Sequence, residues 1–387
     1  MTPLKTISIA EASSRHWDVI VIGAGPAGAV AAHQFGRSGL QVLLIERKIF
    51  PRYKVCGGCL NQRAVNALKE AGLGMVLDRL NAVPLDQFQM RYRGRELQIP
   101  LPGGLAVSRS ALDVELARMA LESGVSFLSE TAALVCGDSH PEQTRMVELF
   151  QQGALCGTAR ASVILVADGL GHPSLQNCEE FESVVSQDSR IGVGVLLPGG
   201  QIQDYTAGTI HMAIHKHGYV GLARVEEGQL NIAAAMDRSF IKQQQSPTGA
   251  VVRILQESGF PIPPAIGEQN LKGTIPLTRK TVRPVAHRLI LVGDAAGYLE
   301  PFTGEGMSNA ISEGIAAASI LPRGLHNWDQ SLEQEWLQVH QTLTMQRLHW
   351  CRWLAQLLRS PTAIGVGLRL FRWFPGIARP IVASLNH

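Results

Sequence analysis

The residues with the clearest chemical purpose are three glycines, Gly23, Gly25 and Gly28, followed by Glu46 roughly twenty residues further on. In a G-x-G-x-x-G pattern the first glycine permits a tight turn and the second lets the backbone approach a phosphate. The third lets a helix pack closely against a strand. A carboxylate at the spacing of Glu46 can accept hydrogen bonds from a ribose diol. Together these residues predict a site for the phosphates and ribose of a dinucleotide.

Two apolar runs with a helix between them must position these residues. Residues 17–22 and 42–46 are short runs rich in β-branched side chains, typical of buried parallel strands. The intervening helix is expected to begin near Pro26, a residue that suits a first turn, with Ala27 beside it. Its unpaired N–H groups and the positive end of its dipole favour an anion. This order predicts a Rossmann-like βαβ unit, but by itself it does not separate FAD from NAD.

A basic loop with paired glycines follows the ribose-binding acid. Arg47 or Arg52 is expected near phosphate or adenine, and a solvated basic turn is the alternative reading. Gly57 and Gly58 would admit a flat ring close to the main chain, as a flavin requires.

Cysteine and histidine spacing does not indicate a metal site. Cys56 and Cys59 form a C-x-x-C, but zinc would need a second pair of ligands. We interpret the spacing as incidental rather than redox-active, with Cys56 alone near the flavin. His211, His215 and His217 share a parity and would face one way from a strand, yet no acid or cysteine completes a metal site at obvious spacing.

Three later segments are expected to contribute to the same site. Ser108 is a candidate N-cap for a helix over residues 109–123 whose first residue, Arg109, points toward the cofactor. Residues 154–160 are expected to form one strand and residues 162–167 another, buried strand that ends at Asp168. Residues 288–294 return to the nucleotide sheet, and Asp294 at the strand end is placed for ribityl hydroxyls. The next helix, opening near residues 304–306 and running to about 318, would turn its N-terminus toward the ring.

A second sheet is expected between these segments. Residues 87–99 alternate polar and apolar side chains around Arg93 and Gly94, which predicts a β-hairpin. Short strands dominate residues 191–236, consistent with a mostly antiparallel sheet that the hairpin would join.

Composition bounds the class of protein. With 387 residues, 45% hydrophobic and 17% charged, the chain is globular and long enough for two interleaved domains. A net charge of +3 argues against a nucleic-acid partner. The first residues lack the apolar core of a signal peptide, so a cytoplasmic protein is expected.

Beyond Glu335 arginines alternate with tryptophans and other apolar residues. This pattern predicts peripheral association with an anionic membrane, and a helix that caps the protein's own core is the alternative.

At this point the motifs resemble a known family. The glycine-rich start, the residues 54–58 loop, Arg109 with Asp113 and Leu116, the Asp168-Gly169 pair, and Gly293-Asp294 with Pro301, Gly304 and Gly306 are similar to those of the geranylgeranyl reductase family. That family lies within the wider group of p-hydroxybenzoate hydroxylases and flavin-dependent halogenases. Two stretches depart from the pattern: residues 168–174 lack the usual serine and arginine, and residues 219–224 lack the aromatic residues of the reductase channel.

The resemblance implies bound FAD. It places Glu46 on the adenosine ribose, Arg109 along the cofactor, and Asp294 with the 304–306 turn at the ribityl chain and ring. The full set expected to bind the cofactor is Gly23, Gly25, Ala27, Gly28, Glu46, Arg47, Arg52, Cys56, Gly57, Gly58, Arg109, Asp168, Gly293, Asp294, Pro301, Gly304, Glu305, Gly306 and Met307. The residues expected to act in catalysis are Cys56, Tyr219 and Glu305.

The prediction is a mixed α/β flavoprotein. Residues 1–170 would form a Rossmann-like FAD-binding domain, with residues 81–100 contributing a hairpin to the substrate sheet. Residues 171–280 would form an inserted, mostly antiparallel substrate-binding sheet, residues 281–325 a return to the FAD domain, and residues 326–387 a basic amphipathic helical tail. The expected function is reduction of carbon–carbon double bonds in a small hydrophobic, isoprenoid or lipid-like substrate, with NAD(P)H or an electron donor protein as reductant. The alternative is a monooxygenase that hydroxylates an aromatic or lipid-like substrate through a flavin hydroperoxide.

Overall fold

The computed structural model describes residues 4–137, 144–200, 203–300 and 305–345. Its largest sheet has the strand order β19-β20-β11-β1-β2-β8, with β10 and β9 continuing from β11. The central strand β1 pairs in parallel with both β2 and β11, as expected for a Rossmann-like unit. The strands of this sheet are β1 (His16–Ile22), β2 (Val42–Ile45), β8 (Ser126–Leu128), β9 (Ala132–Val135), β10 (Arg145–Gln151), β11 (Ala154–Val166), β19 (Val285–Ala286) and β20 (Leu289–Leu291).

One expectation about this sheet is wrong. Residues 154–160 and 162–167 were expected as two strands, but β11 is continuous from Ala154 to Val166. The reason is that Ala161 belongs to two ladders at once: it lies opposite Trp17 of β1 in parallel and opposite Arg145 of β10 in antiparallel. One long strand therefore joins the parallel core to an antiparallel extension.

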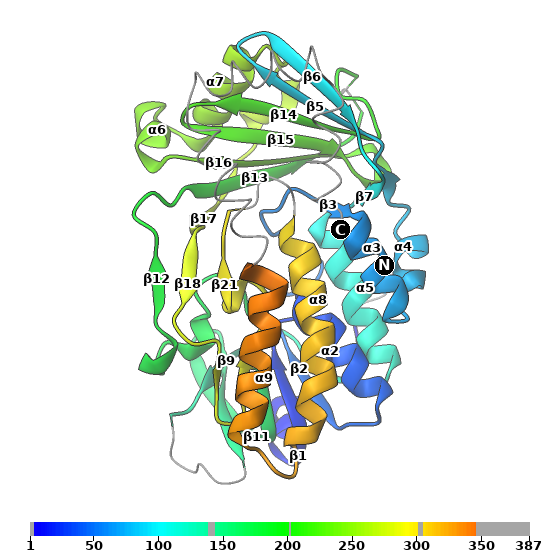
Figure 1. The fold of residues 1–387 in the computed structure, drawn as a ribbon, viewed down its shortest axis with the longest axis vertical. Helices are drawn as coiled ribbons and strands as arrows, with labels where there is room; N and C mark the ends of the chain where they lie inside the picture. Colours follow the sequence, from blue (N-terminus) through cyan, green and yellow to red (C-terminus); the bar gives the residue numbers. More distant parts are fainter. Residues whose placement is uncertain (1–3, 138–143, 201–202, 301–304, 346–387) are drawn as a thin grey trace.

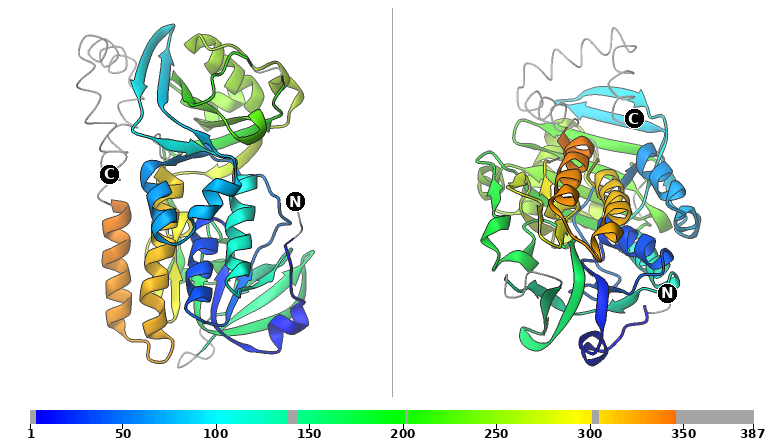
Figure 2. Two further views of the ribbon diagram at one scale, coloured as in Figure 1. Left: turned by 90° about the vertical axis from the view of Figure 1, so that its right-hand side faces the viewer. Right: turned by 60° about the horizontal axis from the view of Figure 1, so that its bottom comes forward.

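Four helices form a layer on one face of this sheet (Figures 1 and 2), and their side chains share one apolar core with it. They are α2 (Pro26–Arg37), α5 (Arg109–Glu122), α8 (Glu305–Ile320) and α9 (Gln330–His340). Small residues set their close packing. A Cβ atom on Gly28 would overlap the carbonyl oxygen of Gly23, and one on Gly314 would overlap that of Ala27. The helix α1 (Ile9–Ser13) packs beside β11 on the other side.

A second sheet lies above the first in Figure 1, with the order β17-β13-β16-β15-β14-β5-β6. All its pairings are antiparallel except that of β14 with β5. The predicted hairpin is confirmed, and both Arg93 and Gly94 adopt positive φ in its turn. The strands are β5 (Gln87–Tyr92), β6 (Arg95–Pro100), β13 (Ile191–Leu197), β14 (Thr209–His215), β15 (Gly218–Arg224), β16 (Leu230–Met236) and β17 (Lys272–Pro276).

Side-chain alternation gives this second sheet two different faces. One face packs against α6 (Arg238–Gln243) and α7 (Pro247–Ser258) in a continuous apolar core. The other face carries a separate apolar cluster from β5, β6, β14 and β15. The second face is the one relevant to the site described below.

Two small sheets and two short helices lie between the large sheets. The first small sheet contains β12 (Ser183–Val185), β18 (Arg279–Thr281) and β21 (Gly297–Tyr298), and the second contains β3 (Cys59–Asn61), β4 (Val83–Pro84) and β7 (Gly104–Ala106). The helices are α3 (Gln62–Glu70) and α4 (Gly74–Arg79). Among the described residues, no helix has the length and hydrophobicity needed to cross a bilayer. The predicted basic tail lies mostly outside the described residues, which end at position 345.

Candidate functional site

The glycine-rich turn presents open backbone donors at the start of α2. Gly25 is the N-cap and Pro26 the first helical residue, and no side chain caps this helix end. Two guanidinium groups approach the same point: a Cβ atom on Gly25 would lie 3.5 Å from Nη2 of Arg109 and 3.9 Å from Nη2 of Arg52. Free N–H groups, a helix dipole and two cations together suit a pyrophosphate.

A buried carboxylate holds these two arginines in place. Asp113, fully buried on α5, accepts hydrogen bonds of 2.8 Å from both Nε and Nη2 of Arg109. Nη1 of Arg52 lies 2.9 Å from the same carboxylate, and Nη2 of Arg52 lies 3.1 Å from Glu46. Burial alone would lower the pKa of Arg109, but the charge of Asp113 outweighs it and raises that pKa. Of the two loop arginines proposed from the sequence, Arg52 takes part in this network, while Arg47 is exposed.

Two unpaired polar atoms near the glycine-rich turn are consistent with binding of a polar ligand there. Nε of Arg52 and Oδ1 of Asp168 are both buried and have no hydrogen-bond partner among the described residues. The other oxygen of Asp168 accepts a hydrogen bond of 2.8 Å from the backbone N–H of Ser174. Burial raises the pKa of Asp168. Orphaned buried polar atoms are rare, and FAD carries phosphate and hydroxyl groups that could pair with them.

The Glu46 carboxylate stands at the end of β2, where the sequence pattern places the ribose contact. Its Oε2 accepts from the backbone N–H of Ala24 at 3.2 Å, and its Oε1 accepts from that of Lys48 at 3.0 Å. Each carboxylate oxygen can accept more than one hydrogen bond, so these contacts orient Glu46 without using up its capacity for a ribose.

The loop with the paired glycines lies directly beside the second sheet. The side-chain amide of Asn231, on β16, donates a 2.8 Å hydrogen bond to the carbonyl of Cys56. A Cβ atom on Gly58 would lie 3.0 Å from that amide, whereas a Cβ on Gly57 would meet no described atom within 4 Å. The loop therefore has free space at Gly57, whereas Gly58 is needed because a side chain there would crowd Asn231.

Residues 288–294, which return to the first sheet, and the start of α8 form another part of the candidate site. Gly293 donates its backbone N–H to Glu313 of α8 at 2.5 Å, and Asp294 lies 3.3 Å from the ammonium of Lys54. Glu305 and Met307 are buried in the first turn of α8, with Gly306 between them. Pro301 and Gly304 lie outside the described residues.

A cluster beside the second sheet joins Tyr219 to three residues that sequence reasoning missed: Arg190, Tyr298 and Glu300. Arg190 is 2% exposed and lies 3.0 Å from Glu300, which is also buried. Tyr219 of β15 hydrogen-bonds with Glu300, and burial together with Glu300 raises its pKa well above the ordinary value. Burial, Asp294 and Cys56 raise the pKa of Tyr298 in the same way. Tyr298 therefore interacts electrostatically with residues on the cofactor side, Asp294 and Cys56, and with Tyr219 of the second sheet.

Two of the three residues expected in catalysis, Cys56 and Tyr219, share an interaction partner. Cys56 and Tyr219 come from different segments, but both interact electrostatically with Tyr298. Glu305 is buried in the first turn of α8, and its catalytic role stays a prediction. Cys56 and Cys59 are both free thiols, and burial raises the pKa of Cys59 to about 12. A protonated Cys59 is a poor redox nucleophile.

The histidines do not form the single row that their spacing suggested. His211 and His215 belong to β14, but His217 lies in the turn after it. His215 contacts Glu257 at 3.1 Å and His217 contacts Asp237 at 3.2 Å. Within the residues that the structure describes, no group of three or more histidine, cysteine or acidic side chains could hold a metal ion.

An apolar strip runs across the second sheet on the side of the paired-glycine loop. The strand register places Met90, Met212, Gly221, Ala233 and Gly194 in one row across five strands. At the end of that row, a Cβ atom on Gly194 would overlap the space of the Tyr53 hydroxyl and lie 3.3 Å from Val55, both in the loop before Cys56. Bulky apolar side chains flank the row: Phe88, Leu97, Ile99, Ile210, Ile214 and Tyr219.

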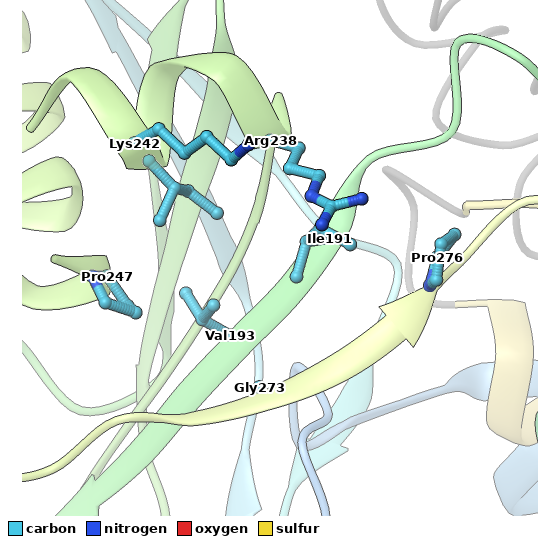
Figure 3. Close-up of a pocket in the computed structure, with 8 residues that line it drawn as sticks. Ile191, Val193, Arg238, Lys242, Pro247, Gly273 and Pro276 are labelled. Atoms are coloured by element: carbon cyan, nitrogen blue, oxygen red, sulfur yellow. The ribbon is translucent and has the colours of Figure 1, made fainter. Parts of the chain in front are cut away.

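A separate pocket of about 440 Å³ lies on the opposite face of the second sheet (Figure 3). Ile191 and Val193 of β13 line it, with Gly273 and Pro276 of β17 on one side. Arg238, Ile241, Lys242 and Pro247 complete the lining. It contains none of the residues predicted to bind the cofactor or act in catalysis.

Comparison with known proteins agrees with this geometry. Residues 16–125 match the family model described as an FAD binding domain. A menaquinone reductase of Mycobacterium tuberculosis is 28% identical over 333 residues, which cover 79% of this chain and 76% of that protein. A digeranylgeranylglycerophospholipid reductase of Methanospirillum hungatei is 23% identical, over 82% of this chain and 79% of that protein.

Solved structures show the same fold at lower identity. The flavin-dependent brominase Bmp2, in a triple mutant, has a TM-score of 0.77 at 18% identity and covers 96% of this chain and 95% of that one. PqsL of Pseudomonas aeruginosa, in complex with 2-aminobenzoylacetate, has a TM-score of 0.72 at 18% identity over 92% of this chain and 99% of that one. The chain therefore contains an FAD binding domain, shares the fold of these flavin-dependent proteins, and is similar in sequence to reductases that include a digeranylgeranylglycerophospholipid reductase.

Proposed function

We propose that the protein reduces carbon–carbon double bonds in an isoprenoid or other lipid-like substrate with electrons from bound FAD. The observation that carries this proposal is the apolar strip, which ends at Tyr53 and Val55 in the loop before Cys56 and the paired glycines. Leu97, Ile99, Met212 and Ile214 of this strip are buried, and its half-buried members are Phe88, Met90, Ile210 and Tyr219. A hydrocarbon chain would gain free energy by covering the apolar surface that these half-buried side chains leave. The names of the menaquinone and digeranylgeranylglycerophospholipid reductases support a hydrophobic isoprenoid substrate.

The protein's part in this reaction is to position the double bond and to supply a proton. Reduced FAD would provide a hydride to one alkene carbon, and the other carbon then needs a proton. Cys56 and Tyr219 are our candidates for the proton donor, and Tyr298 joins them because it interacts electrostatically with both. Both tyrosine hydroxyl groups are protonated at neutral pH, and their raised pKa values make them weaker acids than an exposed tyrosine.

The test is anaerobic turnover of polyprenyl lipids by the chemically reduced holoenzyme, followed by mass spectrometry. We expect products that have gained two hydrogens per reduced double bond. Cys56→Ala should slow turnover while FAD stays bound, whereas the matched control Cys156→Ala, at an exposed cysteine on β11, should not. Equal turnover by wild type and Cys56→Ala would remove Cys56 from the mechanism, and the absence of any reduced lipid would contradict the proposal.

The source of electrons is a separate part of the proposal. We propose NAD(P)H as the external reductant, with an electron donor protein as the alternative. Anaerobic mixing of the oxidised holoenzyme with NADH or NADPH should bleach the flavin absorbance near its visible maximum. A flavin that stays oxidised with both nucleotides would point to a donor protein.

A monooxygenase is the second candidate, because the folds of PqsL and of the brominase are so similar to this one. The same assay separates the two reactions. Under air, a monooxygenase product gains one oxygen atom, whereas a reductase product gains only hydrogen. Oxygen incorporation from labelled O₂ would favour the monooxygenase.

Association with a membrane surface is proposed from the sequence of the tail alone. Its arginines and tryptophans, among them Arg347, Trp350 and Arg352, lie outside the described residues. Sedimentation with liposomes tests the idea: binding to anionic vesicles should exceed binding to neutral ones. Equal binding to both would exclude the arginines as the cause.

A further inference from the structure

Arg190 has a donor group that the fold does not use. Its Nη1 lies 3.0 Å from Glu300 and its Nε lies 3.3 Å from Asp237. Its Nη2 is buried and has no hydrogen-bond partner among the described residues. An arginine is costly to bury, and an unpaired donor on it adds to that cost.

The surroundings of Nη2 suit a hydrogen bond to a ligand. The guanidinium carbon lies 5.8 Å from the centre of the Tyr219 ring, on the face of the second sheet that bears the apolar strip. Tyr219 itself hydrogen-bonds with Glu300. A buried donor beside an apolar surface suits a molecule that is mostly hydrocarbon but carries one hydrogen-bond acceptor.

The local charge indicates what kind of acceptor this is. Glu300 and Asp237 place two negative charges on the single positive charge of Arg190, and His217 shares Asp237 at 3.2 Å. The guanidinium is therefore fully compensated before any ligand arrives. A phosphate or carboxylate would meet repulsion from both acids, whereas a neutral carbonyl oxygen would not.

We propose that Arg190 donates a hydrogen bond through Nη2 to a carbonyl oxygen of the substrate, so that the site selects lipids with an uncharged carbonyl head and a hydrocarbon chain. This inference rests on the proposed function only in placing the substrate on the apolar strip. Arg190 acts here as a specificity-determining residue that fixes how far the chain extends along that strip.

The experiment is equilibrium binding to the oxidised holoenzyme without reductant, so that no turnover occurs. Three probes share one isoprenoid chain and differ only at the end: a prenylated quinone, the prenyl monophosphate and the plain hydrocarbon. We expect the wild type to bind the quinone about 10- to 100-fold more tightly than the hydrocarbon, the range for a hydrogen bond from a charged donor. The monophosphate should not exceed the hydrocarbon in affinity.

Two variants test the residue itself. Arg190→Lys retains a cation beside Glu300 but lacks the Nη2 branch, so its affinity for the quinone should fall to that for the hydrocarbon. Affinity for the hydrocarbon should not change. The matched control is Arg253→Lys, an exposed arginine paired with Glu257 on α7, which should bind all three probes like the wild type. If Arg190→Lys retains too little FAD, the charge-neutral double variant Arg190→Gln/Glu300→Gln replaces it.

Three results would overturn the inference. Tighter binding of the monophosphate than of the quinone by wild type would show a site for anions. Unchanged quinone affinity in Arg190→Lys would show that Nη2 does not contact the head. A shifted flavin absorbance with equal loss for all probes would place Arg190 against the flavin. Because no electrons are transferred, a correct preference without double-bond reduction would contradict only the proposed function.

Discussion

Replacing Gly57 and Gly58 by alanine one at a time should separate an effect on FAD affinity from an effect on the stability of the protein. Gly58 has a φ of +70°, and an alanine Cβ there would lie 3.0 Å from Asn231 and 3.1 Å from the Val107 carbonyl. The left-handed backbone costs about 1–2 kcal/mol for a residue with a Cβ, and crowding adds to this. Gly58→Ala should therefore lower the unfolding free energy of the FAD-free protein by about 2 kcal/mol or more.

Gly57→Ala should behave in the opposite way. No described atom lies within 4 Å of its added methyl group, and Gly57 is not among the glycines with positive φ. The unfolding free energy of the FAD-free protein should therefore change by less than about 0.5 kcal/mol. If the flavin ring lies over this residue, the methyl group intrudes into it and costs about 1–3 kcal/mol of binding energy. The dissociation constant for FAD should then rise about 5- to 150-fold.

Urea unfolding of the FAD-free variants, followed by tryptophan fluorescence, measures the first quantity, and fluorescence titration with FAD measures the second. The reasoning fails if Gly57→Ala binds FAD like the wild type, because the flavin would then lie elsewhere. It also fails if Gly58→Ala is as stable as the wild type without FAD, because the Asn231 contact would then be unimportant.

Three further predictions concern the stability of the fold, at Asp113, Gly28 and His33. Glu96→Gln serves as the control for the first of them. Asp113→Asn leaves the buried Arg109 without its carboxylate partner and removes one of the two acids paired with the half-buried Arg52, so it should lower the unfolding free energy by about 3–5 kcal/mol. Glu96→Gln, which breaks a half-exposed pair, should cost less than about 1 kcal/mol, and equal losses by urea unfolding would contradict this. Gly28→Ala forces α2 away from Gly23 and should cost about 3 kcal/mol or more with loss of FAD, so a variant that retains FAD at normal strength would refute the close packing. Burial and Arg37 lower the pKa of His33 from 6.5 to about 4, so the unfolded chain takes up a proton first as the pH falls. Stability should decline between pH 6.5 and 4, by up to about 3 kcal/mol for this group, and His33→Gln should flatten that decline in unfolding measured across the range.

The sequence predicted well those features in which a short stretch specifies its own structure. The order of strand, glycine turn, helix and acid carries the geometry of the nucleotide cradle within about thirty residues. Ser108 accepts a hydrogen bond from the N–H of Ala111 and begins α5 where expected, because a side-chain cap acts over one helical turn. The hairpin turn at Arg93 and Gly94 is equally local.

The length of β11 was harder to predict from the sequence. The polar segment around Arg160 suggested that one strand ended and another began, yet β11 runs through it. A strand that changes partners along its length has a mixed pattern, since one half is buried on both faces and the other half on one. Only the partners, β1 and β10, determine that the chain stays extended.

The local structure of the glycine-rich turn and the position of Glu46 were thus determined by the sequence itself, whereas the tertiary structure decided the side of the candidate site that faces the second sheet. Arg190, Tyr219 and Tyr298 are far apart in the chain, and no spacing rule relates an arginine before β13 to an acid after β21. Their contacts exist because separate segments, β13, β15 and β21, bring these residues together beside the second sheet. Burial there, rather than residue type, raises the pKa of both tyrosines and leaves one arginine donor unpaired.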